Sequence, residues 1–226
     1  MSPHNDREVL LVGGMSTPGV VRVGDTVRRP VKPDATYVHA LLRYFEERGF
    51  DGAPRYLGLD DDGRAILSYV DGFAPPHNGL RLSDQAVRAG GRLLRAVHDL
   101  TAGTEFAPGS EVACHPNLSQ PNFVLRNMSP VAIIDWDGTK PGPRRDNLGD
   151  FLWAFVHPAL YGDGEPAAQM LEAALDGYGW TGDGIVGAML AAVRGFVDRH
   201  DTGDWGLNEL SYMERNAEFF ERRVGA

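Results

Sequence analysis

Residues 114–137 contain the side chains whose types and spacing are best suited to chemistry. Asn122 offers a neutral amide oxygen and Asp135 a charged carboxylate. They lie at the two ends of a short predicted hairpin with strands at 123–125 and 131–134. Because a tight hairpin brings its ends together, both oxygens could converge on one ion. Mg²⁺ favours a few such oxygens alongside phosphate and water. The alternative is that both side chains cap turns.

Other side chains in this segment have simpler interpretations. His115 is expected to hold the loop by hydrogen bonds. It does not form a nucleophile pair with Cys114, because neighbouring side chains in an extended segment diverge. Asp137 either supports a second metal ion or caps the turn that follows the hairpin.

The elements that must position these residues change in character near residue 71. Apolar runs broken by glycine and proline predict strands first, and apolar residues at helical spacing predict helices later. A connector rich in proline and glycine spans 71–82. The expected strands are 9–12, 20–23, 26–29, 56–59 and 65–70, and the expected helices are 35–48, 83–98, 147–160, 166–178, 183–199 and 207–222.

The chemistry-bearing segment resembles a known family. Its sequence is similar to the His-x-Asp-x-x-x-x-Asn catalytic loop and the Ile-Asp-Trp/Phe metal strand of the small-molecule phosphotransferases, the group of aminoglycoside phosphotransferases and choline kinases. His115 and Asn122 match the loop at its spacing, and Asp135 matches the metal-binding aspartate. Residues 93–99, which read Leu-Leu-Arg-Ala-Val-His-Asp, resemble a helix end of that family, and residues 67–72 resemble its hinge strand.

The resemblance implies an α+β, two-lobed protein-kinase-like fold with a short β-rich N-lobe and a mostly helical C-lobe. Residues 1–70 would form the nucleotide-binding lobe, and residues 71–226 would carry the catalytic-type loop and the metal strand. It also implies Mg²⁺ with ATP or GTP, and a hydroxyl of a small molecule as acceptor. By resemblance, the metal ligands are Asn122, Asp135 and Asp137, and the nucleotide contacts are Gly13, Gly14, Arg28, Arg29, Ser68, Tyr69 and Val70.

The departures from the family pattern concern catalysis. Asn117 stands where the loop has its catalytic aspartate, and Asn147 stands where the family has an aspartate that braces the loop. An amide cannot accept the proton of the acceptor, and a positioned base is worth roughly 10²–10⁴-fold in rate. The phosphate-contacting lysine has no clear counterpart, although Arg28 or Arg29 could serve as the cation. The glutamate that would pair with that lysine falls near Val38 or His39.

Three functions therefore remain open from the sequence. The first is a phosphotransferase in which Asn117 orients the acceptor hydroxyl. The second is a pseudoenzyme that binds a nucleotide, a metabolite or a protein without phosphoryl transfer. The third is an unrelated α+β binding protein.

The amino-acid composition limits the classes of partner and site that we expect. The formal net charge of −9 disfavours nucleic acid, which needs a basic face, and suits a cationic small substrate as well as simple solubility. The single cysteine excludes an internal disulfide and a multi-cysteine metal site. The N-terminus is polar, and no apolar run approaches the roughly 18 residues of a membrane span. The sequence thus predicts a cytoplasmic protein with no membrane partner.

Overall fold

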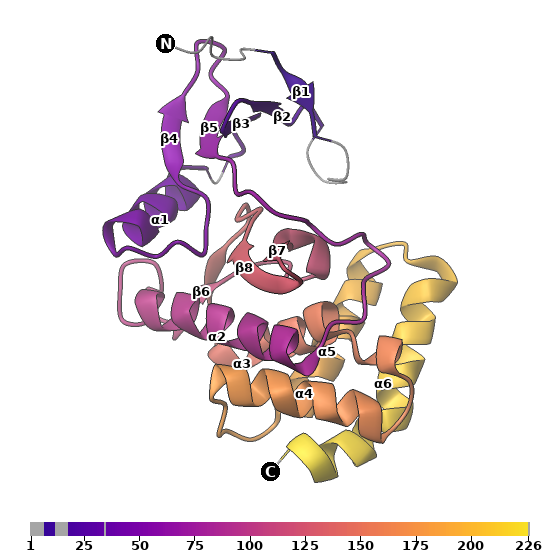
Figure 1. The fold of residues 1–226 in the computed structure, drawn as a ribbon. Coiled ribbons are helices and arrows are strands. Elements are labelled where there is room, and N and C mark those ends of the chain that lie inside the picture. Colours follow the sequence, from indigo (N-terminus) through magenta and orange to yellow (C-terminus); the bar gives the residue numbers. More distant parts are fainter. Residues whose placement is uncertain (1–6, 12–17, 34, 226) are drawn as a thin grey trace.

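The computed structural model describes residues 7–11, 18–33 and 35–225, so the predicted nucleotide-covering residues Gly13 and Gly14 lie outside the described part. The described chain forms two lobes (Figure 1). The upper lobe contains an antiparallel sheet and helix α1 (Ala35–Glu47), and the lower lobe contains the other helices. This is the two-lobed α+β arrangement that the sequence predicts.

In its described residues, the upper lobe contains a five-stranded antiparallel sheet with the order β1-β2-β3-β5-β4. Its strands are β1 (Val9–Leu10), β2 (Val21–Val23), β3 (Thr26–Arg29), β4 (Tyr56–Leu59) and β5 (Ala65–Ser68). The turn between β2 and β3 passes through Gly24, whose φ of 57° lies in the left-handed region that glycine adopts without strain. β3 is the central strand of the sheet, and Arg29 at its end reaches Asp135 of the lower lobe.

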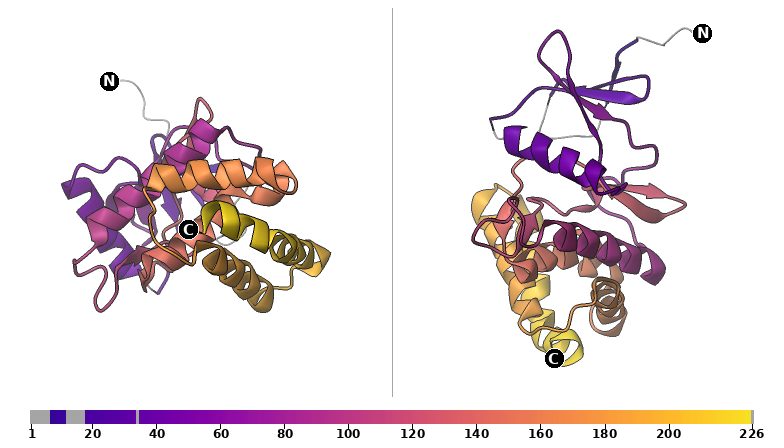
Figure 2. Two further views of the ribbon diagram at one scale, coloured as in Figure 1. Left: turned by 90° about the horizontal axis from the view of Figure 1, so that it is seen from below. Right: turned by 90° about the vertical axis from the view of Figure 1, so that its left-hand side faces the viewer.

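Helix α1 (Ala35–Glu47) joins the two lobes. Its buried residues Val38, Leu41, Leu42 and Phe45 follow helical spacing and form one apolar face. Phe45 packs edge-to-face on Trp136 of the lower lobe, with ring centroids 5.1 Å apart. The right-hand view of Figure 2 shows α1 between the sheet and the helices below it. The relative position of the lobes is therefore fixed in part by apolar packing.

The lower lobe is built around α2 (Asp84–Thr101) and α4 (Glu165–Tyr178), accompanied by α3 (Arg144–Phe151), α5 (Ile185–Arg199) and α6 (Gly203–Val224). Helix α2 begins at its predicted N-cap, where the Ser83 side chain accepts the Ala86 N–H at 3.2 Å. Helices α2 and α4 approach very closely at Gly91. A Cβ atom at this position would lie 2.3 Å from the carbonyl oxygen of Ala174, so only glycine fits there. No helix in the described residues is long and apolar enough to cross a membrane.

The single helix predicted for 147–160 is wrong. Helix α3 starts three residues earlier, ends at Phe151 and continues as the π-helical turn Leu152–Val156, which is followed by the 3₁₀ turn Pro158–Tyr161. His157 between them has a φ of 53°. Pro158 lacks a backbone N–H and disfavours helical geometry at the residue before it, so the regular helix cannot run through.

Four short strands complete the lower lobe. β7 (Phe123–Arg126) and β8 (Ser129–Ile133) form the predicted hairpin. β6 (Val112–Cys114) and β9 (Lys140–Gly142) also pair, although the sequence analysis predicted neither strand. Three residues are too few to show an alternating pattern, which explains why these two strands were missed.

Candidate functional site

The hairpin β7–β8 places Asn122 and Asp135 beside each other. Phe123 pairs with Ile133 in the ladder, and one step further the Ile134 N–H donates to the carbonyl oxygen of Asn122 at 2.8 Å. Asp135 is the next residue along the chain. The two predicted metal ligands therefore leave the same end of one hairpin.

Asp135 has an uncommon backbone conformation. Its φ of 63° lies in the left-handed region, which costs free energy for a residue other than glycine. Its neighbours hold it there: the Trp136 Nε1–H donates to the Ile133 carbonyl at 2.8 Å, and Trp136 itself is buried. Strained residues of this kind concentrate at functional sites, so the conformation supports a role for Asp135 beyond stability.

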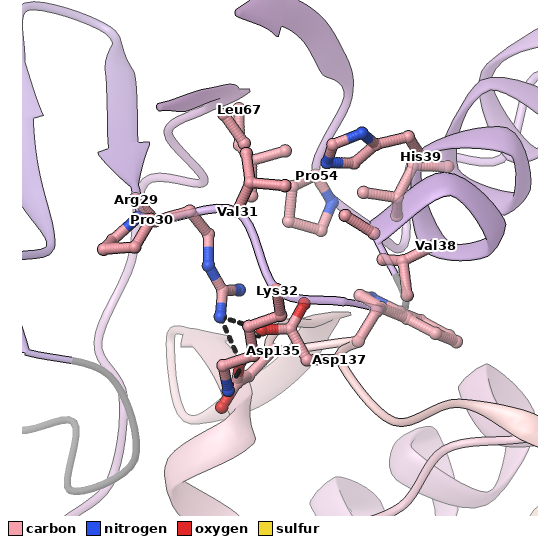
Figure 3. Close-up of a pocket in the computed structure, with 14 residues that line it drawn as sticks. Arg29, Pro30, Val31, Lys32, Val38, His39, Pro54, Leu67, Asp135 and Asp137 are labelled. Carbon is pink, nitrogen blue, oxygen red and sulfur yellow. Dashed lines mark hydrogen bonds and ion pairs between the residues drawn. The ribbon is translucent and has the colours of Figure 1, made fainter. Parts of the chain in front are cut away.

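The carboxylates of Asp135 and Asp137 face two cations from the upper lobe, Arg29 and Lys32 (Figure 3). Arg29 Nη2 donates to Asp135 Oδ1 at 3.0 Å and also to Asp137 Oδ2, and Lys32 Nζ lies 3.2 Å from Asp137 Oδ2. Arg28 instead directs its guanidinium to Thr26 Oγ1 at 2.5 Å and toward Asp60 at 3.8 Å. Of the two predicted phosphate cations, the structure thus brings only Arg29 to the aspartates.

A small pocket surrounds these charges. It is lined from the upper lobe by the segment that follows β3, by α1 and by Leu67, and from the lower lobe by Asp135, Trp136 and Asp137. Ser68, Tyr69 and Val70 do not line it. The N–H groups of Ser68 and Tyr69 donate to the carbonyls of Arg55 at 2.9 Å and Asp25 at 2.8 Å. Val70 is therefore left to supply any N–H contact to adenine from this predicted trio.

The loop before the hairpin is held by a neutral histidine. His115 Nδ1 accepts the Asn117 N–H at 3.2 Å, so its Nε2 carries the proton and donates to the Ile134 carbonyl at 3.0 Å. Burial lowers the pKa of His115 to about 4. The imidazole is therefore uncharged at neutral pH and ties the loop to the residue preceding Asp135.

Asn117 is exposed and helps to shape the loop. Its Oδ1 accepts the Ser119 N–H at 3.1 Å, and its carbonyl accepts from Asn122 Nδ2 at 2.9 Å. Because the amide nitrogen of Asn122 is used in this way, Asn122 Oδ1 is the atom of that group suited to a cation. No carboxylate occupies position 117, so the loop has no base at that position.

Asn147 braces the loop from behind as an amide. Its Nδ2 donates to the His115 carbonyl at 2.8 Å, and its Oδ1 accepts the His115 N–H at 3.2 Å and the His98 Nε2–H at 3.1 Å. His98 Nδ1 in turn accepts from the Tyr178 hydroxyl at 2.7 Å, and burial lowers the pKa of His98 to about 4. An aspartate could not donate to the His115 carbonyl. The asparagine at 147 therefore preserves the brace.

Asp150 is a loop contact that the sequence analysis missed. Its Oδ2 accepts the Leu118 N–H at 3.2 Å, and burial raises its pKa to about 6. Asp150 follows Asn147 by three residues on α3, so both side chains share one helix face toward the loop. That spacing is the signal by which the sequence could have revealed it.

The oxygens at this site suit Mg²⁺ bound together with phosphate groups. Within the described ranges, no group of three or more His, Cys, Asp or Glu side chains is arranged to hold a metal ion. Mg²⁺ commonly takes one or two carboxylates and obtains its other ligands from phosphate and water. One amide oxygen and two carboxylates fit that pattern.

Known proteins resemble this chain in sequence. No family model matches the sequence. A trifolitoxin immunity protein from Rhizobium leguminosarum bv. trifolii is 31% identical over 202 residues, which covers 77% of this chain and 75% of that protein. The mobilization protein A of Escherichia coli is 33% identical over 108 residues, but these are 46% of this chain and only 20% of that protein.

Solved structures match the fold over much of the chain. A choline/ethanolamine kinase family protein from Mesorhizobium loti has a TM-score of 0.58 and 13% identity, covering 98% of this chain and 92% of that one. An aminoglycoside phosphotransferase from Streptomyces rimosus, in complex with ADP and streptomycin, has a TM-score of 0.55 and 15% identity, covering 73% and 84%. These likenesses confirm the predicted kinase-like fold and its resemblance to the small-molecule phosphotransferases.

Proposed function

The chain belongs to the family of the trifolitoxin immunity protein, and from that premise and the site geometry we propose that it binds a Mg²⁺–nucleotide between its lobes and transfers the γ-phosphoryl group to a small-molecule hydroxyl. The nucleotide is ATP or GTP. The upper lobe, residues 1–70, would bind the nucleotide, and residues 71–226 would supply the loop and the metal ligands.

One observation carries this proposal. Asn122 and Asp135 leave adjacent positions of one hairpin, joined by the 2.8 Å hydrogen bond from Ile134 to Asn122, and Asp135 is held in a strained left-handed conformation. Two oxygens that leave one end of a hairpin can bind a single ion together with phosphate and water, and the left-handed backbone fixes the position from which the Asp135 carboxylate extends.

Each residue has a defined role in this proposal. Asn122 Oδ1 and Asp135 would hold Mg²⁺, with Asp137 as a further ligand, and the bound ion would neutralise charge on the phosphate groups. Arg29 contacts the phosphates from the end of β3. His115 and Asn147 keep the loop in place, so that the ligands need no rearrangement when the nucleotide arrives.

Asn117 limits the rate of transfer. Its exposed amide can orient an acceptor hydroxyl, but it cannot take the proton that leaves as the phosphoryl group arrives. Phosphoryl transfer depends mainly on positioning and electrostatics, so activity is retained at a reduced level. The expected deficit is roughly 10²–10⁴-fold, the usual value of a positioned base.

The comparisons suggest the class of acceptor. The relative is named for immunity to a toxin, and one structural neighbour was solved with streptomycin bound. We therefore propose an antibacterial compound that bears a hydroxyl group. The net charge of −9 favours a cationic compound.

A pseudoenzyme is the second candidate. The observation in its favour is the pair of amides at 117 and 147, together with the contact of Arg29 on the predicted metal carboxylates. Such a protein would bind a nucleotide, a metabolite or a protein partner and transfer nothing.

The test is nucleotide turnover by the wild type and by Asn117→Asp, with a panel of aminoglycosides and amino alcohols as acceptors. A carboxylate at 117 should raise turnover by roughly 10²–10⁴-fold, which corresponds to about 3–5 kcal/mol of barrier. Asn127→Asp, in the exposed turn between β7 and β8, is a matched control that should change nothing. Turnover that is absent from both wild type and Asn117→Asp would favour the pseudoenzyme. Robust wild-type turnover with no gain would show that another residue acts as base.

A further inference from the structure

Arg29, Lys32, Asp135 and Asp137 form an ionic cluster between the lobes (Figure 3). Arg29 contacts both carboxylates, whereas Lys32 contacts only Asp137. The side chains of Arg29 and Asp137 are 11% and 13% exposed, so this pair is largely removed from water. Charges in such surroundings interact strongly, and removing one leaves its partner uncompensated.

The cluster is formally neutral, with two positive and two negative groups. A divalent cation that arrived alone would add two positive charges to a partly buried site. It would also have to compete with Arg29 for Asp135 Oδ1 and Asp137 Oδ2, the oxygens that the guanidinium contacts. Binding of a free metal ion is therefore opposed both by repulsion and by loss of the Arg29 contacts.

A metal ion that arrives with a polyphosphate meets different conditions. The phosphate oxygens bring negative charge and accept a guanidinium in the same two-point geometry as a carboxylate. Arg29 can then turn from the aspartates to the phosphates while the metal takes the carboxylates. We propose that Arg29 is an internal counter-cation that makes this site select a metal–polyphosphate complex over a free metal ion.

Arg29 carries this role more than its neighbours do. Lys32 is 32% exposed and reaches a single carboxylate, so solvent screens it more. His39 lines the same pocket, but burial lowers its pKa, which leaves the imidazole largely neutral at pH 7. The identity of the polyphosphate as a nucleotide rests on the proposed function, whereas the exclusion of free metal rests on the cluster alone.

The experiment measures Mn²⁺ binding from the electron paramagnetic resonance signal of the free ion, with and without ATP or GTP. The wild type should bind Mn²⁺ weakly alone and more tightly when the nucleotide is present. Arg29→Gln should bind Mn²⁺ alone at least about tenfold more tightly, because one competing unit charge is gone. The same variant should bind the Mn²⁺–nucleotide complex more weakly, because it lacks the phosphate cation. These two effects have opposite signs.

Two further variants serve as controls. Arg28→Gln removes the same charge from the neighbouring position, whose side chain pairs with Asp60, and should leave the affinity for Mn²⁺ alone unchanged. Arg29→Lys keeps the charge and should remain close to the wild type in Mn²⁺ affinity. If Arg29→Gln fails to fold by circular dichroism, Lys32→Gln should still shift the affinity for Mn²⁺ alone in the same direction by a smaller factor.

The outcomes separate this inference from the proposed function. Equal or weaker binding of Mn²⁺ alone by a folded Arg29→Gln would overturn the counter-cation. If Arg29→Gln binds Mn²⁺ alone more tightly and the wild type binds neither ATP nor GTP, the result would support the counter-cation and reject the proposed nucleotide function.

Discussion

The back and the front of the loop at 115–122 are held by different forces. Behind the loop, Asn147 and two neutral histidines form a buried hydrogen-bond network that accounts for both backbone polar groups of His115. In front, Asp135 and Asp137 are held by the side chains of Arg29 and Lys32. A neutral, buried network is directional and costly to break, whereas ionic contacts can be exchanged for other ions. The difference suggests that the network behind the loop is a rigid platform, and that Asp135 and Asp137 in front form an exchangeable region whose ionic contacts can be replaced.

The largest expected effect on the free energy of unfolding comes from changing Asn147 in the platform. Asn147→Asp would place a carboxylate oxygen against the His115 carbonyl in a buried position. It should lower the free energy of unfolding by about 3 kcal/mol, because it leaves an acceptor unpaired and buries a charge. Urea denaturation at pH 7 measures this, with the exposed Asn127→Asp as control. A loss no larger than that of the control would show that the network behind the loop is dispensable.

A smaller effect is expected at Asp150, which contacts the loop from the same helix face as Asn147. Burial raises its pKa to about 6 in the folded protein. The protonated form is thus favoured by folding, so its stabilising contribution is complete below the ordinary pKa of about 4 and is lost as the pH rises through 6.

The variant Asp150→Asn removes this titration. Its free energy of unfolding should exceed that of the wild type by about 1 kcal/mol at pH 7.5, and the advantage should shrink toward pH 4. Denaturation curves across that pH range measure the difference. A wild type whose stability shows no excess dependence on pH over Asp150→Asn would contradict the buried, charged state of this carboxylate.

The smallest effect is expected in the exchangeable region. Lys32→Gln removes a partly exposed ion-pair partner and should change the free energy of unfolding by less than about 1 kcal/mol. Thermal denaturation at low and high salt measures this difference, which should shrink at high salt because the ion pair is screened. A loss as large as that of Asn147→Asp would remove the distinction between the two regions.

The sequence predicted the hairpin and the proximity of Asn122 and Asp135 because their signals are local. Short apolar runs define β7 and β8, and the ends of any tight hairpin must meet. The contact of Arg29 with Asp135 joins residues far apart in the chain, so no local pattern announces it. The bracing role of Asn147 was obscured for a different reason. Its value depends on donating to the His115 carbonyl, and residue type alone suggested the loss of a carboxylate.

Other misses have equally physical causes. The helical segment ends after Val156, where Pro158 follows left-handed His157 and the Gln120 side chain donates to the Phe155 carbonyl at 2.9 Å. A proline gives only an approximate end to a helix, and the glutamine comes from another part of the chain. β6 and β9 are stabilised by each other and carry no pattern of their own.

Calorimetric titration of the wild type and Asp135→Ala with ATP or GTP, each with and without Mg²⁺, tests the central claim most directly. Asp135 is the charged ligand in the proposed metal site, and the hairpin holds it next to Asn122. The account predicts that the wild type binds one of the nucleotides more tightly with Mg²⁺, and that Asp135→Ala loses this magnesium-dependent part. Equal affinity of the two proteins for the Mg²⁺–nucleotide would contradict it.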